Sequence, residues 1–331
     1  MGGDFAPRNV VAGAVEALQE SKGRFSLILV GQEGPIRAEV NKASHQSDGI
    51  KDTSFSIVHA AEVIDMHDLP NAALKTKKDS SITVGITLHR DGKADAFISA
   101  GNTGAVLSAS TLILGRVKGV GRPTIGAMLP TESEPCLLLD AGTNVDCRAS
   151  HLFEFAVMGS IYLEAMTGKS KPAVGLLSIG EEDTKGNEVS LEAFALLKKS
   201  KLNFVGNVEG RDILKGKIDV VVCDGFVGNI LLKFGESIPS FLKAKFKAFA
   251  EQSTWKKIMV LMARNGMRSV MKELDYQEHG GVPLLGVNGV SIIGHGGSTP
   301  KAIKNMIYRA EEMVRRNVHL RIQEAMQNQT S

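Results

Sequence analysis

The feature that most constrains this chain is a repeated unit, in which a short aliphatic run ends at a glycine or polar turn and a helical pattern follows. Six such runs occupy residues 25–31, 95–101, 136–142, 173–180, 218–225 and 290–297. Continuous aliphatic runs of this length are typical of strands buried on both faces of a parallel sheet. Helical patterns cover about 8–22, 80–91, 103–115, 150–167, 187–200 and 298–326. The alternation predicts a doubly wound α/β fold.

Composition is that of a globular protein. Of the 331 residues, 43% are hydrophobic and 23% are charged, which is enough apolar material to bury a core. No apolar run reaches the roughly 18 residues that suggest a membrane span. No linker, low-complexity segment or internal repeat marks a boundary, so we expect residues 1–331 to form a single domain.

The three cysteines, Cys136, Cys147 and Cys223, have no CxxC spacing. The chain also opens without the charged and apolar regions of a signal peptide. A reducing cytoplasm and three free thiols are therefore the simpler expectation.

Residues 236–276 differ from the rest, because a long helical pattern runs through them without a strand. Gly266 is expected to divide the pattern into two helices that project as a hairpin. Between Phe241 and Lys272, eight Lys or Arg residues accompany one acid, a charge of +7 that leaves −4 on the remainder of the +3 chain. A solvated helix face is the usual cause of a charge run, and a surface for an acidic partner or an anionic membrane is the alternative.

The N-terminus has a glycine turn that no predicted strand precedes. Gly2, Gly3 and Asp4 form a loop-like start, and the helical pattern at 8–22 follows at once. In α/β folds a glycine turn of this kind connects a strand to a helix. The pattern looks as if the strand that should feed the turn were missing.

Glycine-rich polar loops follow five of the predicted strands. The first is Gly101-Asn102-Thr103-Gly104, and the others span 140–148, 178–188, 223–230 and 294–300. In an open parallel sheet, ligands bind beyond the carboxyl ends of the strands. Loops with little side-chain bulk let main-chain N–H groups approach an anion there, and the dipole of a following helix favours negative charge. One such loop alone could equally be a tight turn with a helix cap. Five converging loops favour a phosphate-bearing or anionic ligand.

Several familiar signatures are absent from the sequence. It contains no GxGxxG, Walker A, GxSxG or HExxH motif. Acidic loop residues could supply oxygen ligands for Mg²⁺ if they converged, but acids in loops are more often helix caps, and we predict no metal site. These acids are Asp140, Asp146, Glu181, Glu182, Asp183 and Asp224.

Taken together and in order, the motifs resemble one known family. MGGDFAP, AGNTGA, DAGTN, SIGEEDTKGNE, DGFVGNI and GVNGVSIIGHGGS span almost the whole chain and closely resemble the bacterial PlsX family, the phosphate:acyl-carrier-protein acyltransferases of phospholipid synthesis. The resemblance implies transfer of a fatty acyl group from acyl carrier protein to inorganic phosphate, giving acyl phosphate. It also implies a homodimer, peripheral attachment to the cytoplasmic face of the membrane, and a three-layer α/β/α sandwich akin to phosphotransacetylases and isocitrate dehydrogenases.

Such chemistry needs no enzyme nucleophile, because phosphate itself attacks and a thiolate leaves. The protein must align the reactants, supply donors to the developing oxyanion and exclude water. We predict that Lys185 brings a mobile positive charge, that Asn144, Asn229 and the amides of 295–298 donate to the substrate, and that His295 moves a proton near neutral pH. A structural role for His295 and a solvated loop position for Lys185 are the alternatives. The full predicted set for substrate and phosphate is Gly101, Asn102, Thr103, Gly104, Asp140, Asn144, Gly180, Gly186, Asn187, Asp224, Gly225, Gly296 and Ser298, with His295, Lys185 and Asn229 as catalytic residues.

The expected hairpin is predicted to bind the partners of the protein. Its apolar positions recur at helical spacing (Trp255, Ile258, Met259, Met262, Val270, Met271 and Leu274), and its charged ones are Lys256, Lys257, Arg264, Arg268 and Lys272. A basic amphipathic surface suits acyl carrier protein and an anionic bilayer, and the apolar stripe suits a dimer interface. An acyl-phosphate:glycerol-3-phosphate acyltransferase is expected downstream; no cofactor and no nucleic acid is expected.

Two other classes compete with this interpretation. A nicotinamide-dependent decarboxylating dehydrogenase would share the expected fold, but a fold alone does not confer function. A membrane scaffold without enzymatic activity would need only the hairpin, and it would leave the five glycine loops unexplained.

Overall fold

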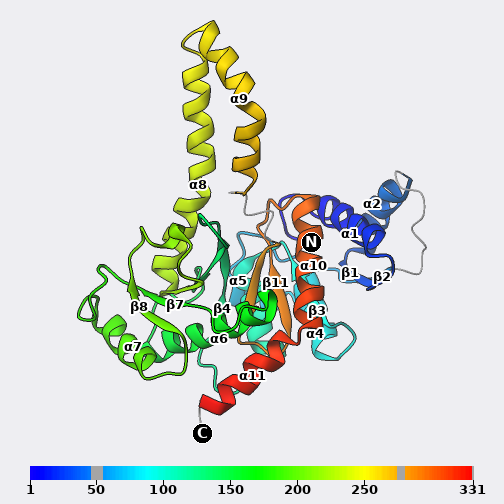
Figure 1. Ribbon diagram of the computed structural model, residues 1–331. Helices are drawn as coiled ribbons and strands as arrows, with labels where there is room; N and C mark the ends of the chain where they lie inside the picture. Colours follow the sequence, from blue (N-terminus) through cyan, green and yellow to red (C-terminus); the bar gives the residue numbers. More distant parts are fainter. Residues whose placement is uncertain (46–54, 274–279, 330–331) are drawn as a thin grey trace.

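The computed structural model describes residues 1–45, 55–273 and 280–329, and it is an α/β protein with a protruding helical hairpin (Figure 1). The strands form three sheets with the orders β1-β2, β3-β11-β10-β4 and β5-β6-β9-β7-β8. Their bounds are β1 Leu27–Gly31, β2 Phe55–His59, β3 Ala96–Ser99, β4 Thr124–Ile125, β5 Ala127–Leu129, β6 Cys136–Leu139, β7 Val174–Leu177, β8 Phe204–Val208, β9 Val220–Val222, β10 Val282–Leu285 and β11 Val290–Ile293.

Helices cover both faces of the larger sheets. They are α1 Arg8–Ser21, α2 Glu33–His45, α3 Pro70–Thr76, α4 Ser81–Arg90, α5 Thr103–Ala109, α6 Ala149–Thr167, α7 Glu188–Lys198, α8 Gly225–Ala250, α9 Thr254–Glu273, α10 Pro300–Arg315 and α11 Val318–Gln329. A π-helical turn, Ser110–Leu114, extends α5, and a 3₁₀ turn spans Ile213–Lys215.

Alternating side chains of the central strands explain the layers. In β6, Leu137 and Leu139 enter one hydrophobic cluster, while Cys136 and Leu138 enter another on the opposite face. The same split occurs in β9, where Val221 faces away from its two neighbours. Successive strand side chains point to opposite faces, so these continuous aliphatic runs need a helix layer on each side. The predicted three-layer α/β/α arrangement is confirmed.

All six predicted strands are present, and the five that precede the predicted glycine loops end before those loops begin. The sequence patterns missed β2, β8 and β10, the very short β4 and β5, and the helices α2 and α3. The predicted helix at 298–326 is two helices, because α10 ends at Arg315 and Asn317 adopts a left-handed φ of 54° before α11.

The hairpin is real, but two of its predicted boundaries are wrong. It begins at Gly225 rather than at 236, so the segment 225–230 is the first turns of α8 and not a loop. The break between the helices falls at 251–253, and Gly266 lies inside α9. A glycine inside an exposed helix costs only about 1 kcal/mol, which the surrounding helix formers tolerate.

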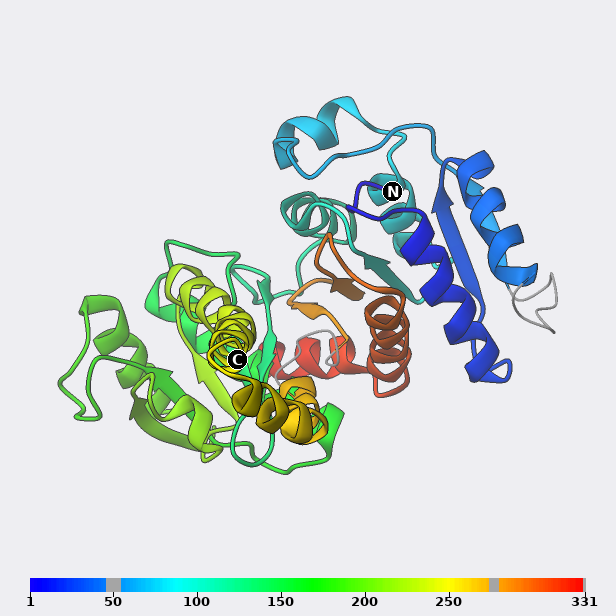
Figure 2. The ribbon, with the colours of Figure 1, turned by 90° about the horizontal axis from the view of Figure 1, so that it is seen from above.

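One hydrophobic core joins the two halves seen from above in Figure 2. It contains Ala14 of α1, Phe155 of α6, Val220 of β9 and Ile303 of α10. No helix among the described residues is long and apolar enough to cross a membrane. The three cysteines are free thiols, as expected.

Candidate active site

Parallel strand pairs bring the predicted loops to two edges. β11 lies parallel to β3 with Ile293 opposite Ser99, so the loops after these strands leave the same edge. In the five-stranded sheet, β6, β9 and β7 are parallel, so the loops beginning at 140, 223 and 178 leave a second edge together.

At the first edge, the N-terminal loop joins the two predicted loops. The amide of Asp4 donates to the carbonyl of Gly296 (3.0 Å). A Cβ on Gly3 would lie 2.6 Å from the carbonyl oxygen of Ala100 and 3.3 Å from that of Gly296, so only glycine allows this approach. The main chains of 2–4, 100–104 and 294–298 therefore form one tightly packed surface.

Asn102 holds this surface in place. Its Oδ1 accepts from the Ala105 amide (3.0 Å) and caps α5, and its Nδ2 donates to the carbonyls of Asp65 (3.0 Å) and Asp68 (3.1 Å). The side chain is buried and all of these bonds are within the protein, so the Asn102 amide group is not left free to bind a ligand, and the first-turn amides of Thr103 and Gly104 are the donors that remain. Helix N-termini leave such donors without intrahelical partners.

His295 and Ser298 lie in the loop before α10. The Gly297 amide donates to Nδ1 of the exposed His295 (3.1 Å), and Oγ of the buried Ser298 donates to the His295 carbonyl (2.6 Å). Ser298 therefore shapes the loop, while the imidazole stands at its surface with Nδ1 fixed as an acceptor. Thr299 caps α10 by accepting from the Ala302 amide (3.3 Å).

At the second edge, Asp140 organises the loop after β6. Its buried carboxylate accepts from the amides of Gly142 (3.0 Å) and Asn144 (2.8 Å), from both groups of Thr143, and from Asn144 Nδ2 (2.7 Å). Asn144 Nδ2 also donates to the Pro123 carbonyl (2.8 Å). Asp140 and the Asn144 side chain thus build the loop rather than stand open to a substrate.

This loop is attached to the start of α8. The Gly225 amide donates to the Asn144 carbonyl (2.7 Å), and a Cβ on Gly225 would lie 2.7 Å from the Asn144 nitrogen. Asp224 caps the helix by accepting from the Val227 amide (2.8 Å). Asn229 is exposed one turn later and lies against Gly142. Its amide therefore remains the best placed side-chain donor at this edge.

A shared hydrophobic cluster brings the two edges together. It contains Ala105 and Val106 of α5, Ala141 just after β6 and Ile293 at the end of β11, with Leu232 of α8 packed against it. The first turns of α5 and α8 therefore flank one region. Each helix N-terminus carries a partial positive charge, so the two together favour an anion there.

The loop 178–187 stands at the outer side of the second edge. Gly180 is buried against the Lys185 side chain, and Gly186 has a φ of +120°. Asn187 caps α7 by accepting from the Ser190 amide (2.9 Å). Lys185 is exposed, and its hydrogen bonds are main-chain contacts with Ser178, Glu182 and Asn207. Among the described residues, no hydrogen bond joins this loop to residues 101–104.

Sequence reasoning missed Asp4. A Cβ placed on Gly297 would lie 3.4 Å from His295 Nδ1 and 3.5 Å from Asp4 Oδ2, so the carboxylate and the imidazole flank the same glycine. Asp4 follows a Gly-Gly pair as the other site residues follow glycines. The glycine pair could have identified Asp4 as a site residue. It did not, because no predicted strand placed the N-terminal loop at a sheet edge.

The thiols are poorly suited to nucleophilic attack. Burial, followed by the negative charges of Asp140 and Asp224, raises the pKa of the half-buried Cys147 to about 11. Burial raises the pKa of Cys136 to about 12 and holds that of Cys223 well above its usual range. The thiolate is the reactive form of cysteine, so these three side chains are inert near neutral pH.

No group of three or more His, Cys, Asp and Glu side chains is arranged to hold a metal ion within the described ranges. Asp183 instead pairs with Lys198 (2.7 Å), and Glu181 lies 3.8 Å from Arg211.

The five cations predicted to bind partners lie along α9. Lys257, Arg264 and Arg268 are exposed, whereas Lys256 donates to Gln252 (2.6 Å) and stacks over the Phe249 ring. The side chain of Lys272 and the whole of Leu274 lie outside the described residues. Large apolar side chains share the helix, among them Trp255 at 76% and Met262 at 74% exposure.

Comparison with known proteins identifies the family. The model of the fatty acid synthesis protein family matches residues 1–321. A phosphate acyltransferase of Pelotomaculum thermopropionicum is 50% identical over 314 residues, covering 95% of this chain and 90% of the relative. One of Heliobacterium modesticaldum is 48% identical over 324 residues, covering 98% of this chain and 95% of the relative.

Solved structures agree on the fold. A phosphotransacetylase from Streptococcus pyogenes superposes with a TM-score of 0.60 at 18% identity, covering 92% of this chain and 91% of that one. A branched-chain phosphotransacylase from Enterococcus faecalis gives 0.54 at 15% identity, covering 88% and 99%. The predicted likeness to phosphotransacetylases is confirmed. The chain belongs to the fatty acid synthesis protein family, whose relatives at this level of identity are phosphate acyltransferases.

Proposed function

We propose that this protein transfers a fatty acyl group from the thioester of acyl carrier protein to inorganic phosphate, giving acyl phosphate for phospholipid synthesis. Two phosphate acyltransferases are 50% and 48% identical to this chain over nearly its whole length, which supports the acyl transfer and the phosphate acceptor. The carrier-bound donor and the acyl phosphate product are the finer parts of the proposal.

The observation that carries the proposal is the meeting of two helix N-termini at adjoining sheet edges. The first-turn amides of α5 and the start of α8 flank one region, joined through the cluster of Ala105, Ala141 and Ile293. Rigid main-chain donors of this kind bind phosphate without a charged pocket, and they need no reorganisation when an oxyanion develops.

The reaction balances without a cofactor or a covalent enzyme intermediate. An oxygen of hydrogen phosphate attacks the thioester carbonyl carbon and forms a C–O bond. The C–S bond then breaks, and the departing thiolate takes up the proton that phosphate releases. The products are acyl phosphate and the free thiol. The raised pKa of Cys147 supports this route, because the cysteine near the site stays protonated.

Three side chains have roles in this scheme. Asn229, exposed beside Gly142, donates to the thioester oxygen. His295 accepts the Gly297 amide at Nδ1, so its proton lies on Nε2; it donates this proton to the leaving sulfur and takes up the proton that phosphate releases, with Asp4 on the other side of Gly297. Lys185 reaches phosphate from its exposed loop after the substrate binds.

The hairpin is the docking surface of this scheme. Its exposed cations suit the acidic carrier protein and an anionic membrane, and its apolar stripe suits a second copy of the chain in a homodimer. Attachment to the cytoplasmic face of the membrane would deliver acyl phosphate to a downstream glycerol-3-phosphate acyltransferase.

The test is phosphate-dependent discharge of acyl carrier protein by Lys185→Ala and His295→Ala. Each should lower kcat/KM by about 100-fold, the usual effect of removing a positioned donor or acid–base group. Lys199→Ala, an exposed lysine at the end of α7, is the matched control and should stay within about twofold. Near-normal rates in both site variants would remove these roles.

A further inference from the structure

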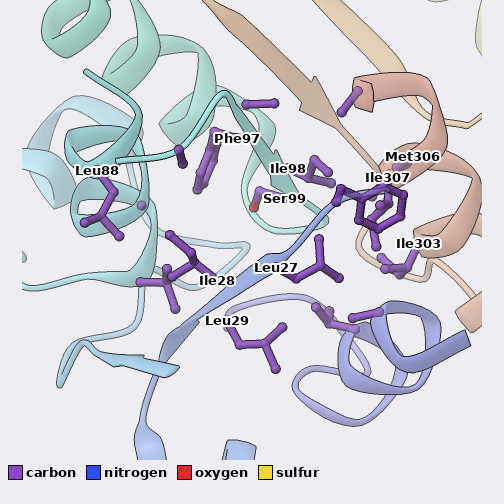
Figure 3. Close-up of a pocket in the computed structure, with 18 of the residues that line it drawn as sticks. Leu27, Ile28, Leu29, Leu88, Phe97, Ile98, Ser99, Ile303, Met306 and Ile307 are labelled. Carbon is purple, nitrogen blue, oxygen red and sulfur yellow. The ribbon is translucent and has the colours of Figure 1, made fainter. Parts of the chain in front are cut away.

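An apolar cavity of about 530 Å³ lies between β1 and β3 (Figure 3). Of the described residues that line it, three have positive side chains (Arg24, Lys93 and Arg315) and two have negative ones (Asp95 and Glu311). The cavity therefore offers little net charge, and a partner that is recognised by its charge needs a different surface.

A surface of that kind lies beside the second edge of the candidate site. The segments 115–122 and 145–151 contain four cations (Arg116, Lys118, Arg122 and Arg148) and one acid, Asp146. The four cationic residues are exposed, and none of their side chains forms an ion pair with an acid among the described residues. We call Arg116, Arg122 and Arg148 the arginine patch.

The imidazole of His151 connects the two segments. A Cβ on Gly121 would lie 3.2 Å from its Nε2, and its Nδ1 accepts from the Arg148 amide (3.1 Å). Arg116 Nη1 donates to the Gly121 carbonyl. Burial, followed by the positive charges of Arg122 and Arg148, lowers the pKa of His151. The three guanidinium groups therefore gather around one imidazole.

Glu154 faces the patch from the next turn of α6. Its carboxylate accepts from the Gly121 amide (2.8 Å), and burial is the largest influence on its pKa, which is raised. Four cations against Asp146 and Glu154 leave a net charge of +2. The main chain of the loop uses the Glu154 carboxylate, so the guanidinium groups of Arg122 and Arg148 remain available to an anion from outside.

The patch is bonded to the loop that adjoins the proposed thioester donor. The carbonyl of Pro123, the residue after Arg122, accepts from Asn144 Nδ2 (2.8 Å). The Asn144 carbonyl accepts from the Gly225 amide (2.7 Å), and Asn229 follows one turn later in α8. A macromolecule that places its thioester at Asn229 therefore approaches the protein beside this surface.

We propose that the arginine patch is a docking surface for acidic side chains of the acyl carrier protein, next to the site of the reaction. The inference rests on the proposed function, in which the carrier protein is the acyl donor. It adds a second contact to the one proposed for the hairpin, and this contact would orient the carrier so that its acyl arm points toward Asn229.

The number of arginines favours carboxylates as the groups that bind. An arginine fork binds one carboxylate or one phosphate group through two parallel hydrogen bonds. The phosphodiester of the carrier's acyl arm has a single negative charge and would engage one fork. Several separate forks suit a protein surface with several carboxylates, and opposite charges also steer such a partner into one orientation.

The test compares Arg122→Glu combined with Arg148→Glu against Lys199→Glu combined with Lys201→Glu, two exposed lysines on another part of the body. Surface plasmon resonance measures binding of the full chain, without phosphate, to the carrier protein with its acyl arm and to the carrier without the arm. The arginine variant should lose at least about tenfold in affinity for both forms, mainly through slower association, and the control should stay within about twofold. The loss should shrink in 1 M salt, where charges are screened beyond about 3 Å.

A second variant separates loss of charge from loss of folding. Arg122→Gln combined with Arg148→Gln removes both positive charges without adding acids to the surface. Because the replaced side chains are exposed, its melting temperature should lie within about 2 °C of that of the original chain. Its affinity for the carrier should still fall by at least about threefold.

Equal affinity of the arginine variants and the lysine control for the carrier would overturn the proposal, as would an original chain that does not bind the carrier. A loss confined to the carrier with its arm would assign the patch to the phosphodiester instead. Weaker binding to phosphatidylglycerol vesicles, with carrier binding intact, would assign it to the membrane.

Binding needs no turnover, so the two proposals can fail separately. A chain that binds the carrier through the patch but forms no acyl phosphate would refute the proposed function and leave the docking surface in place.

Discussion

The carboxylate of Asp140 holds the candidate site in shape although it is buried and not open to a substrate. Every oxygen of this buried side chain is used by donors from the loop 142–144. The same loop receives the first amide of α8 through the Asn144 carbonyl. Asp140 thereby sets the distance between the end of β6 and the start of the hairpin helix.

We expect Asp140→Asn to lower the free energy of unfolding by about 3 kcal/mol, because the new NH₂ group would face donors and leave buried groups unsatisfied. Asp224→Asn is the matched control. Asp224 acts as a helix cap, where Asn serves as well as Asp, so its cost should stay under about 0.5 kcal/mol. Urea unfolding of both variants measures the difference, and equal costs would show that the Asp140 network is unimportant.

At the scale of elements, α8 extends from the candidate site to the tip of the hairpin. It runs without a break from Gly225, bonded to the site loop, to Ala250 near the tip, although it contains Pro239. α9 returns beside it with exposed cations and apolar side chains (Figure 1). One continuous helix thus connects the proposed docking surface to the proposed chemistry.

Charge reversal tests that surface. Arg264→Glu combined with Arg268→Glu should raise KM for acyl carrier protein and weaken binding to phosphatidylglycerol vesicles by at least about tenfold, since each cation contributes about 1 kcal/mol at an anionic surface. Lys199→Glu with Lys201→Glu, on the body of the protein, is the control and should change neither quantity. If the hairpin variant behaves like this control, the basic surface has no docking role.

For the whole molecule, the sequence predicted the buried strands well, but it predicted the short strands and the turn of the hairpin poorly. The runs around Cys136–Leu139 and Val290–Ile293 were predictable, because strands buried on both faces leave a continuous apolar signal. Strands such as Thr124–Ile125 were not, since two residues carry no period and pair only with a distant segment, β10. The hairpin turn was misplaced at Gly266, because the actual turn at 251–253 contains neither Gly nor Pro.

The candidate site divides in the same way. Glycine loops at strand ends predicted where 101–104, 140–144 and 295–298 lie, because parallel strands must end at a common edge. Which side chains remain available was not predictable. The side-chain amides of Asn102 and Asn144 donate hydrogen bonds to the carbonyls of Asp65 and Pro123, which are distant in the sequence. Only the tertiary fold brings these partners together.

The most direct test of the central claim uses acyl carrier protein loaded with a fatty acyl group, together with phosphate labelled with ¹⁸O. The account predicts acyl phosphate whose bridging oxygen is ¹⁸O, with no acyl adduct on the protein by intact mass. Acylation of a protein side chain in the absence of phosphate, or discharge that proceeds at the same rate without phosphate, would contradict it.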